Sequence, residues 1–345
     1  MTDERPAVIR PTGWIVAVVF AAVAAGIVAM GLNDRWGRSG PGLGQRFEYQ
    51  IEAYKQIDST LLRWQKTAEF DTQAGPARAV AVGPDGRIYV GGQEAVEVFD
   101  LQGTRVGRLP AATAVYCLAV EGAAGGPVRR LLVGLKDHVE VWSPSGEVQA
   151  RWPSPSPRSV LTSIALVGDE VFVADAGTQT VYRFSPAGNL SGRIGRDQRG
   201  AGGFVVPSPF FDVAAGPKGL LYIVNPGALR IETRTRDGLL RAFWGESSAG
   251  IEGFFGCCNP ANLAVLPDGR LVTAEKGLLR VKVYTPEGNL ESVVAGPQQL
   301  ESPPAASAGL ADHEFTAVDV ATDAYGRVVV LDRNTGRVRV FEEKR

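Results

Sequence analysis

The chain has 345 residues, 45% of them hydrophobic, and a formal net charge of −1. This length is sufficient for a sizeable folded domain, and the balanced charge gives no reason to expect a nucleic-acid partner. The histidines are His138 and His313 alone, which excludes a three-histidine metal site. The sequence also contains no Gly-x-Ser-x-Gly elbow and no phosphate-binding glycine loop.

The N-terminal part contains one long apolar run. Trp14 to Leu32 is a stretch of 19 residues without a charge. A helix rises about 1.5 Å per residue, so this stretch spans roughly 28 Å, close to the hydrocarbon thickness of a bilayer. We predict a transmembrane anchor over residues 14–32. A cleaved signal peptide is the rival interpretation, because Ala22-Val23-Ala24 resembles a cleavage site, but cutting there leaves residues 26–32 as an exposed apolar tail.

Charges do not set the orientation of this anchor, because similar numbers of arginines flank both sides of it. A short tail before one span and a large domain usually stays in the cytoplasm, and long domains translocate largely regardless of charge. We therefore expect residues 1–13 to be a cytoplasmic tail and the rest of the chain to lie on the periplasmic or extracellular side. Residues 33–59 are expected to form a linker. Its Phe47, Ile51 and Tyr54 follow helical spacing and predict a short membrane-proximal helix.

From residue 60 to residue 345, a segment of roughly 40 to 55 residues recurs six times. Each copy has a glycine turn between two alternating apolar runs, as in Val82-Gly83-Pro84-Asp85-Gly86-Arg87-Ile88. A third run ending on an aromatic residue, a second turn and a fourth run follow, as in residues 281–295. Four antiparallel strands per copy are typical of a propeller blade. We predict an all-β fold, a six-bladed β-propeller of four-stranded antiparallel blades.

The last copy lacks its fourth strand, because Val338-Arg339-Val340-Phe341 is a third strand and the chain ends at Arg345. An unpaired run at residues 61–70, ahead of the first copy, resembles the fourth strands. Pairing of this run with the last blade would close the ring and remove its exposed edges.

The blades resemble those of the NHL-repeat family of six-bladed propellers, most clearly at Pro260-Ala261-Asn262-Leu263-Ala264-Val265-Leu266-Pro267-Asp268-Gly269. The resemblance covers about residues 60–345 and implies a fold; it does not imply an activity, since propellers carry many unrelated functions.

Strand direction places the long loops. With strands lettered A to D from the axis outward, the A–B and C–D turns lie on one face, and the B–C loops and D–A crossovers lie on the other. Three crossovers are long, at residues 196–209, 246–259 and 297–314. They belong to neighbouring blades and crowd one sector of one face, where function is expected.

The crossover at 246–259 contains two adjacent cysteines, Cys257 and Cys258. No Cys-x-x-Cys spacing accompanies them, which excludes a zinc ribbon. Three interpretations remain open: a vicinal disulfide, two reduced thiols packed beside phenylalanines, and a site for copper or another soft metal. We predict that this crossover and the facing B–C loop form the binding face, with these members: Phe254, Phe255, Cys257, Cys258, Asn259, Glu275 and Lys276. Phe254 and Phe255 are expected to be exposed apolar anchors on this face.

Two sets of equivalent positions carry polar side chains. The A strands begin at Ala79, Cys117, Ser163, Asp212, Asn262 and Asp319. Similarity to lactonase-like propellers implies calcium or another divalent cation near the axis, held by Asp212, Asn262 and Asp319. The alternative is that these side chains bond backbone N–H groups of the inner strands. The B–C loops open with Asp175, Asn225, Glu275 and Asp332, which resemble the loop-turning Asp of the NHL pattern.

Taken together, the sequence predicts a membrane-anchored, extracytoplasmic propeller that binds a protein partner or ligand through its loop-rich face. The alternatives are a metal-assisted hydrolase or lactonase-like enzyme and a redox-associated subunit that uses Cys257 and Cys258.

Overall fold

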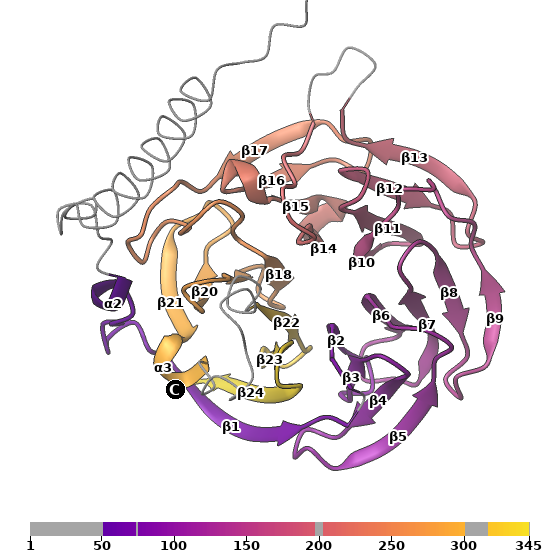
Figure 1. Cartoon of the computed structure of the whole chain (residues 1–345), viewed down its shortest axis with the longest axis horizontal. Coiled ribbons are helices and arrows are strands. Elements are labelled where there is room, and N and C mark those ends of the chain that lie inside the picture. The colour runs from indigo at the N-terminus through magenta and orange to yellow at the C-terminus, as the bar shows by residue number, and fades with distance from the viewer. Residues whose placement is uncertain (1–50, 74, 197–202, 301–316, 345) are drawn as a thin grey trace, which may run out of the picture. The chain divides into compact units, whose positions relative to one another are not determined.

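The computed structural model describes residues 51–73, 75–196, 203–300 and 317–344. Within these residues, six four-stranded antiparallel sheets surround a central axis (Figure 1). The predicted six-bladed propeller is therefore confirmed, and it belongs to the compact unit formed by residues 52–345. The predicted tail, the predicted anchor at 14–32 and residues 33–50 of the linker lie outside the described residues, as do residues 197–202 and 301–314 of the long crossovers predicted at 196–209 and 297–314. No helix among the described residues is long and apolar enough to cross a membrane.

Each of the first three blades runs from the axis outward in chain order. Blade 1 contains β2 (Ala79–Val82), β3 (Ile88–Gly91), β4 (Ala95–Phe99) and β5 (Arg105–Pro110). Blade 2 contains β6 (Cys117–Gly122), β7 (Val128–Gly134), β8 (Val139–Trp142) and β9 (Val148–Arg151). Blade 3 contains β10 (Leu161–Val167), β11 (Glu170–Asp175), β12 (Thr180–Phe184) and β13 (Leu190–Ile194).

The remaining three blades repeat the pattern, with the last one completed by the N-terminal strand. Blade 4 contains β14 (Val213–Ala215), β15 (Leu221–Asn225), β16 (Arg230–Arg234) and β17 (Leu240–Trp244). Blade 5 contains β18 (Asn262–Val265), β19 (Leu271–Ala274), β20 (Val281–Tyr284) and β21 (Leu290–Ala295). Blade 6 contains β22 (Val318–Thr322), β23 (Val328–Asp332), β24 (Arg337–Glu343) and β1 (Trp64–Asp71).

Four short helical segments accompany the strands in the part of the chain that the structure describes. They are α2 (Ile51–Tyr54), which lies at the predicted membrane-proximal helix, α3 (Pro297–Leu300), and the 3-10 turns η1 (Pro217–Gly219) and η2 (Pro226–Ala228).

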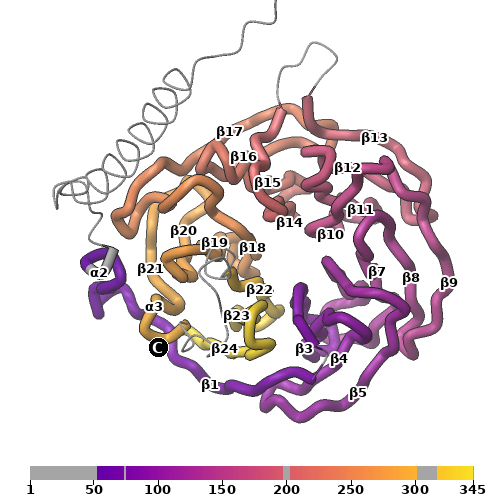
Figure 2. The backbone as a smooth tube through the Cα atoms, viewed as in Figure 1, coloured from indigo at the N-terminus to yellow at the C-terminus, as the bar shows by residue number. Residues whose placement is uncertain are grey.

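The ring closes as predicted, through β1. This strand pairs antiparallel with β24, from Trp64 opposite Glu343 to Asp71 opposite Arg337 (Figure 2). Trp64 is buried, and its indole N–H donates to Ser292 Oγ of β21 at 3.1 Å. The first strand of the propeller therefore supplies an outer edge to blade 6 and a buried aromatic contact to blade 5.

Neighbouring blades also interlock through their outer strands. A Cβ added at Gly288, in the C–D turn of blade 5, would collide with the Trp244 ring of blade 4, and Gly188 bears the same relation to Trp152. Both glycines have positive φ values, 94° and 86°, which residues with a Cβ rarely adopt. The turn glycine of one blade therefore packs directly against a large side chain at the outer strand of the preceding blade, where a Cβ would not fit.

Candidate functional site

The innermost strands of the six blades line a channel of about 490 Å³ along the axis. Strand register shows that five of the six A-strand positions recognised in the sequence are equivalent, with Ser163 opposite Ala174; the sixth, Asp212, precedes β14, and its carbonyl accepts from Val224 N at 2.9 Å. Ala79 pairs with Gly91, Cys117 with Gly134, Asn262 with Ala274, and Asp319 with Leu331. Asp212, Asn262 and Asp319 accordingly come from three consecutive blades and all line the channel.

The polar side chains at this end of the channel connect adjacent blades. Asp212 accepts hydrogen bonds from its neighbour Val213 N and from Leu263 N of blade 5, both at 2.7 Å. Asn262 Nδ2 donates to the Val318 carbonyl of blade 6 at 2.7 Å. Asp319 accepts from Val80 N of blade 1 at 2.8 Å and from Val320 N at 3.0 Å. These contacts are the hydrogen bonds to backbone groups that were the predicted alternative to metal binding.

Burial raises the pKa values of the two acids among these residues, Asp212 and Asp319. Desolvation raises the pKa of Asp212 to about 7, and the nearby Asp319 charge adds to the effect. Desolvation also raises the pKa of Asp319 to about 6, against the attraction of the Arg333 guanidinium. Both carboxyl groups can therefore exchange protons close to neutral pH.

A hard cation such as calcium needs about six to eight oxygen ligands. Asp212 and Asp319 each already accept two backbone hydrogen bonds. In the described ranges, no three His, Cys, Asp or Glu side chains cluster in a way that could hold a metal ion. The hydrogen bonds between adjacent blades account for the positions of these side chains, and calcium at this site stays a prediction.

The polar residues that open the B–C loops hold the preceding crossover in place. Asp175 Oδ1 accepts from Val160 N at 2.9 Å, and Asn225 Oδ1 accepts from Val205 N at 2.9 Å. In each case the donor lies in the crossover that enters the same blade. Asp175 and Asn225 therefore fasten the crossover to the B–C loop of the same blade by accepting hydrogen bonds from its backbone.

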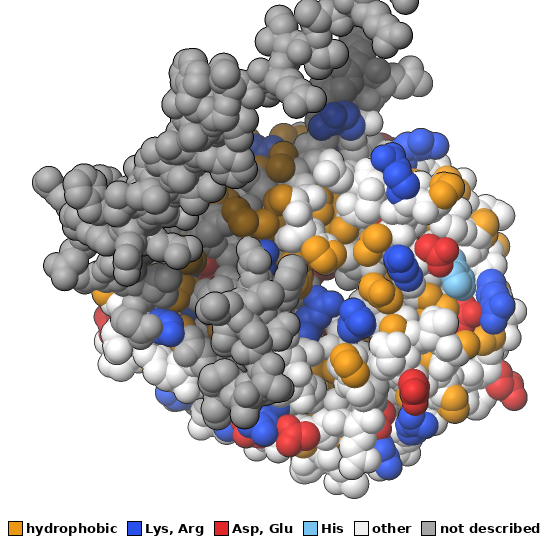
Figure 3. Space-filling model, in the orientation of Figure 1, with side chains coloured by type: hydrophobic (Ala, Val, Ile, Leu, Met, Phe, Trp, Pro, Cys, Tyr) orange, Lys and Arg blue, Asp and Glu red, His pale blue; other side chains and the backbone are white. Residues whose placement is uncertain are grey.

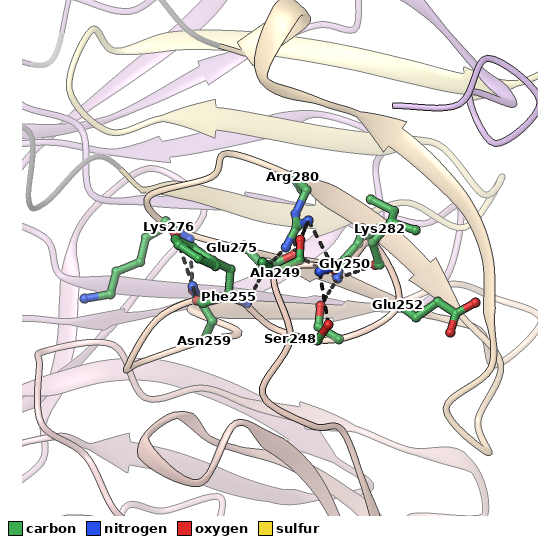
Figure 4. A network of polar contacts seen from close by, with 12 residues as sticks. Ser248, Ala249, Gly250, Glu252, Phe255, Asn259, Glu275, Lys276, Arg280 and Lys282 are labelled. Carbon is green, nitrogen blue, oxygen red and sulfur yellow. Dashed lines mark hydrogen bonds and ion pairs between the residues drawn. The ribbon is translucent and has the colours of Figure 1, made fainter. Parts of the chain in front are cut away.

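In blade 5, the equivalent residue is Glu275, which lies in a buried ionic network (Figure 4). Its carboxylate is 2.8 Å from Arg280 Nη2 and 2.8 Å from Lys282 Nζ, and it accepts a hydrogen bond from Phe255 N at 3.0 Å. Glu275, Arg280 and Lys282 are at most 1% exposed. We refer to these three residues as the ionic triad.

Arg280 and Lys282 of the ionic triad, together with Tyr284, donate hydrogen bonds to five consecutive carbonyl groups of the crossover, those of residues 249–253. Arg280 Nη1 donates to the carbonyls of residues 249 and 250, at 3.1 and 3.3 Å. Lys282 Nζ donates to those of residues 251 and 253, at 2.9 and 2.7 Å, and Tyr284 Oη donates to that of residue 252 at 2.9 Å. Burial lowers the pKa of Lys282 to about 8, while the Glu275 charge opposes this shift. The path of the crossover is thus fixed by side chains of β20 and the loop that precedes it.

The predicted binding-face residues divide by exposure. Cys257 is exposed and Phe255 and Lys276 are half-buried, whereas the other four are buried: Phe254, Cys258, Asn259 and Glu275. The expectation that Phe254 is an exposed anchor is wrong. Its ring packs between Trp244 and Tyr284, with centroid distances of 6.0 and 5.9 Å, because the crossover folds its apolar side onto blade 5.

The two cysteines lie at the tip of this crossover as neighbouring thiols. Their Sγ atoms are 3.0 Å apart, with Cys257 exposed and Cys258 buried. The hydrogen bond with Cys258 raises the pKa of Cys257, while the nearby Lys276 charge lowers it. Asn259 joins the tip to the B–C loop: its Nδ2 donates to the carbonyls of Phe255 and Lys276, and its Oδ1 accepts from Lys276 N at 2.9 Å.

Arg280 and Lys282 are not among the residues that the sequence predicts for this site. Both lie in the apolar run Leu278-Leu279-Arg280-Val281-Lys282-Val283, whose members are all buried. A charged residue among positions that should all face the core was the available signal, because a buried charge requires a partner.

No protein-family model and no curated protein matches this chain. Among solved structures, a streptogramin B lyase is similar with a TM-score of 0.55 and 12% sequence identity, over 83% of this chain and 100% of that chain. A virginiamycin B lyase from Staphylococcus aureus has a TM-score of 0.52 and 12% identity, over 81% of this chain and 99% of that chain. At such identities the similarity shows a shared propeller fold, which agrees with the NHL-type resemblance.

Proposed function

We propose that this protein is a binding propeller that captures a protein partner or ligand on its loop-rich face, around the crossover at 246–259. The observation that carries the proposal is the ionic triad, which uses buried charges to hold carbonyls of an otherwise irregular segment. Burying charges costs several kcal/mol unless they are well paired. Such rigid support is typical of segments that must present a surface in one fixed shape. The surface so presented contains Phe255 and Cys257.

The proposal includes a membrane anchor at residues 14–32, with the propeller on the periplasmic or extracellular side. Its support is the length of the uncharged run and the size of the domain that follows. A tethered domain with one loop-rich face fits a receptor or assembly role at a membrane surface.

The test compares the two faces in the full-length protein purified from its own membranes after reversible chemical cross-linking. A variant with Phe255→Ala and Cys257→Ser should lose the cross-linked partner, while its thermal unfolding stays unchanged. A matched variant with Pro144→Ala and Pro286→Ala, in C–D turns on the opposite face, should retain the partner. Equal recovery with both variants contradicts the proposal.

A second candidate is acid–base chemistry in the channel, as in the hydrolase or lactonase-like alternative. The observation that favours it is the pair Asp212 and Asp319, whose pKa values of about 7 and about 6 suit proton transfer. The similar solved structures are lyases by name, which is compatible with chemistry on this fold. Elemental analysis of the purified protein tests the calcium prediction, and loss of any hydrolytic activity in Asp212→Asn tests the acid.

The redox alternative rests on the Cys257 and Cys258 thiols at 3.0 Å. Counting free thiols in protein isolated without reductant distinguishes a disulfide from two thiols.

A further inference from the structure

Three basic side chains lie on the loop-rich face, at the end of the inner strands where Asp212 and Asp319 also lie. Lys276 follows the Glu275 that opens the B–C loop of blade 5, and Arg333 follows the equivalent Asp332 of blade 6. Arg78 immediately precedes the first strand of blade 1, which is the next blade around the ring. We refer to Arg78, Lys276 and Arg333 as the mouth cations. Figure 3 shows Lys and Arg side chains close to the centre of the ring.

Aromatic rings hold the mouth cations in place. Lys276 Nζ and Arg333 Cζ each lie 5.3 Å from the centroid of the same Phe210 ring, which is itself buried. Arg78 Cζ lies 4.9 Å from the centroid of the Tyr116 ring. Cation–π contacts leave the outer N–H groups of a guanidinium or ammonium available to a further partner.

The charge of this cluster is incompletely neutralised within the described residues. No ion pair between a carboxylate and any of the three cations is found there, Lys276 Nζ donates to Ser208 Oγ at 3.5 Å, and the buried Arg78 Nε has no hydrogen-bond partner. The charges of Asp319 and Asp212 favour the charged form of Arg333. Their oxygens accept backbone N–H bonds, as described above, and burial raises the pKa of both groups. Desolvation and the charge of Arg78 in turn lower the pKa of Arg333.

We infer that the channel mouth binds a small organic anion, with a carboxylate or phosphate group among the mouth cations and the remainder of the molecule in the channel. Arginine side chains suit such groups because their N–H donors match two anion oxygens at once. The channel volume of about 490 Å³ falls within the roughly 300–1,000 Å³ that is usual for small-molecule sites. Ser163 and Asn262 in the channel wall would contact polar groups of the ligand.

The anion site lies on the same face as the proposed partner site and so rests on the proposed function, but anion binding is measured by calorimetry and partner binding by cross-linking. Inorganic phosphate and succinate are titrated calorimetrically into the full chain in detergent, at constant ionic strength. We expect saturable binding of at least one of them, and the one that binds identifies the head group. Arg333→Gln and Arg78→Gln should each weaken binding about tenfold, since each removes charge-assisted hydrogen bonds.

Lys136→Gln is the matched control. Lys136 occupies the position of Lys276 and Arg333 in the B–C loop of blade 2, is exposed, and should leave binding unchanged. Thermal unfolding of each variant shows whether it is folded. Absence of saturable binding of both anions, or equal binding by folded Arg333→Gln, Arg78→Gln and wild type, would overturn the inference. Partner cross-linking at Phe255 is measured separately. If the partner still cross-links but neither anion binds, the anion site is refuted and the proposed function still stands.

Discussion

Glu275→Gln is the most informative single change to the support of the crossover. It removes the negative charge that faces Arg280 and Lys282, both at most 1% exposed, and leaves two buried cations beside a neutral amide. Removing one partner of a buried ion pair costs about 3–5 kcal/mol. Lys282 limits the cost, because its pKa of about 8 allows it to lose its proton near neutrality. We therefore expect a loss of about 3 kcal/mol in the free energy of unfolding at pH 7.

The stability difference between Glu275→Gln and wild type should also depend on pH, because Lys282 loses its proton near pH 8. Above pH 8, Lys282 is largely neutral in the wild type, so Glu275 then has one buried cation to neutralise, where at pH 7 it has two. The difference between variant and wild type should narrow between pH 7 and 9. Urea unfolding followed by tryptophan fluorescence measures both quantities. Glu252→Gln, an exposed change on the same crossover, should stay within about 0.5 kcal/mol. A loss below about 1 kcal/mol, or one that is constant with pH, would refute the role assigned to the ionic triad.

The remaining predictions concern the pH response, the ring and the anchor. The pKa of Lys282 is lowered from 10.5 to about 8, so wild type should gain about 3 kcal/mol relative to Lys282→Met as pH rises from about 8 to 10.5; a flat difference contradicts this. Trp64→Ala should cost about 3–5 kcal/mol in unfolding experiments because it empties the contact that closes the ring, and an unchanged melting temperature contradicts that role. Gly288→Ala should destabilise more than Gly269→Ala, which has a similar φ but nothing within 4 Å of its Cβ; equal losses would remove the contact with Trp244 from the explanation. Protease added to spheroplasts should degrade the propeller while residues 1–13 remain with the membrane, whereas a protected propeller contradicts the proposed orientation.

Local patterns made the blades predictable. Alternating apolar residues and turn glycines specify each hairpin within about ten residues, so six copies and one missing strand were enough to predict closure by residues 61–70. The equivalence of Asp212, Asn262 and Asp319 followed from the same alignment. The sequence left two roles open for these side chains, metal binding and hydrogen bonding to the backbone, because residue type alone does not distinguish them.

The non-local contacts were not predictable in the same way. Phe254 appeared to be a surface anchor because nothing in its neighbourhood shows that the crossover folds back against Trp244 and Tyr284. The grouping of Phe210, Lys276 and Arg333 joins three blades, and no local sequence pattern connects them. Functional surfaces on a propeller arise where loops of different blades meet, so the repeat predicts their position and leaves their composition open.

The central claim is that the face around the crossover at 246–259 makes the functional contact, and site-specific photo-cross-linking in intact membranes tests it most directly. A photo-reactive phenylalanine analogue replaces Phe255 in one protein and Tyr325 in another. Tyr325 is 78% exposed in an A–B turn on the opposite face. We predict a discrete cross-linked product from position 255 and none from position 325. Products from position 325 alone, or the same products from both positions, would contradict the account.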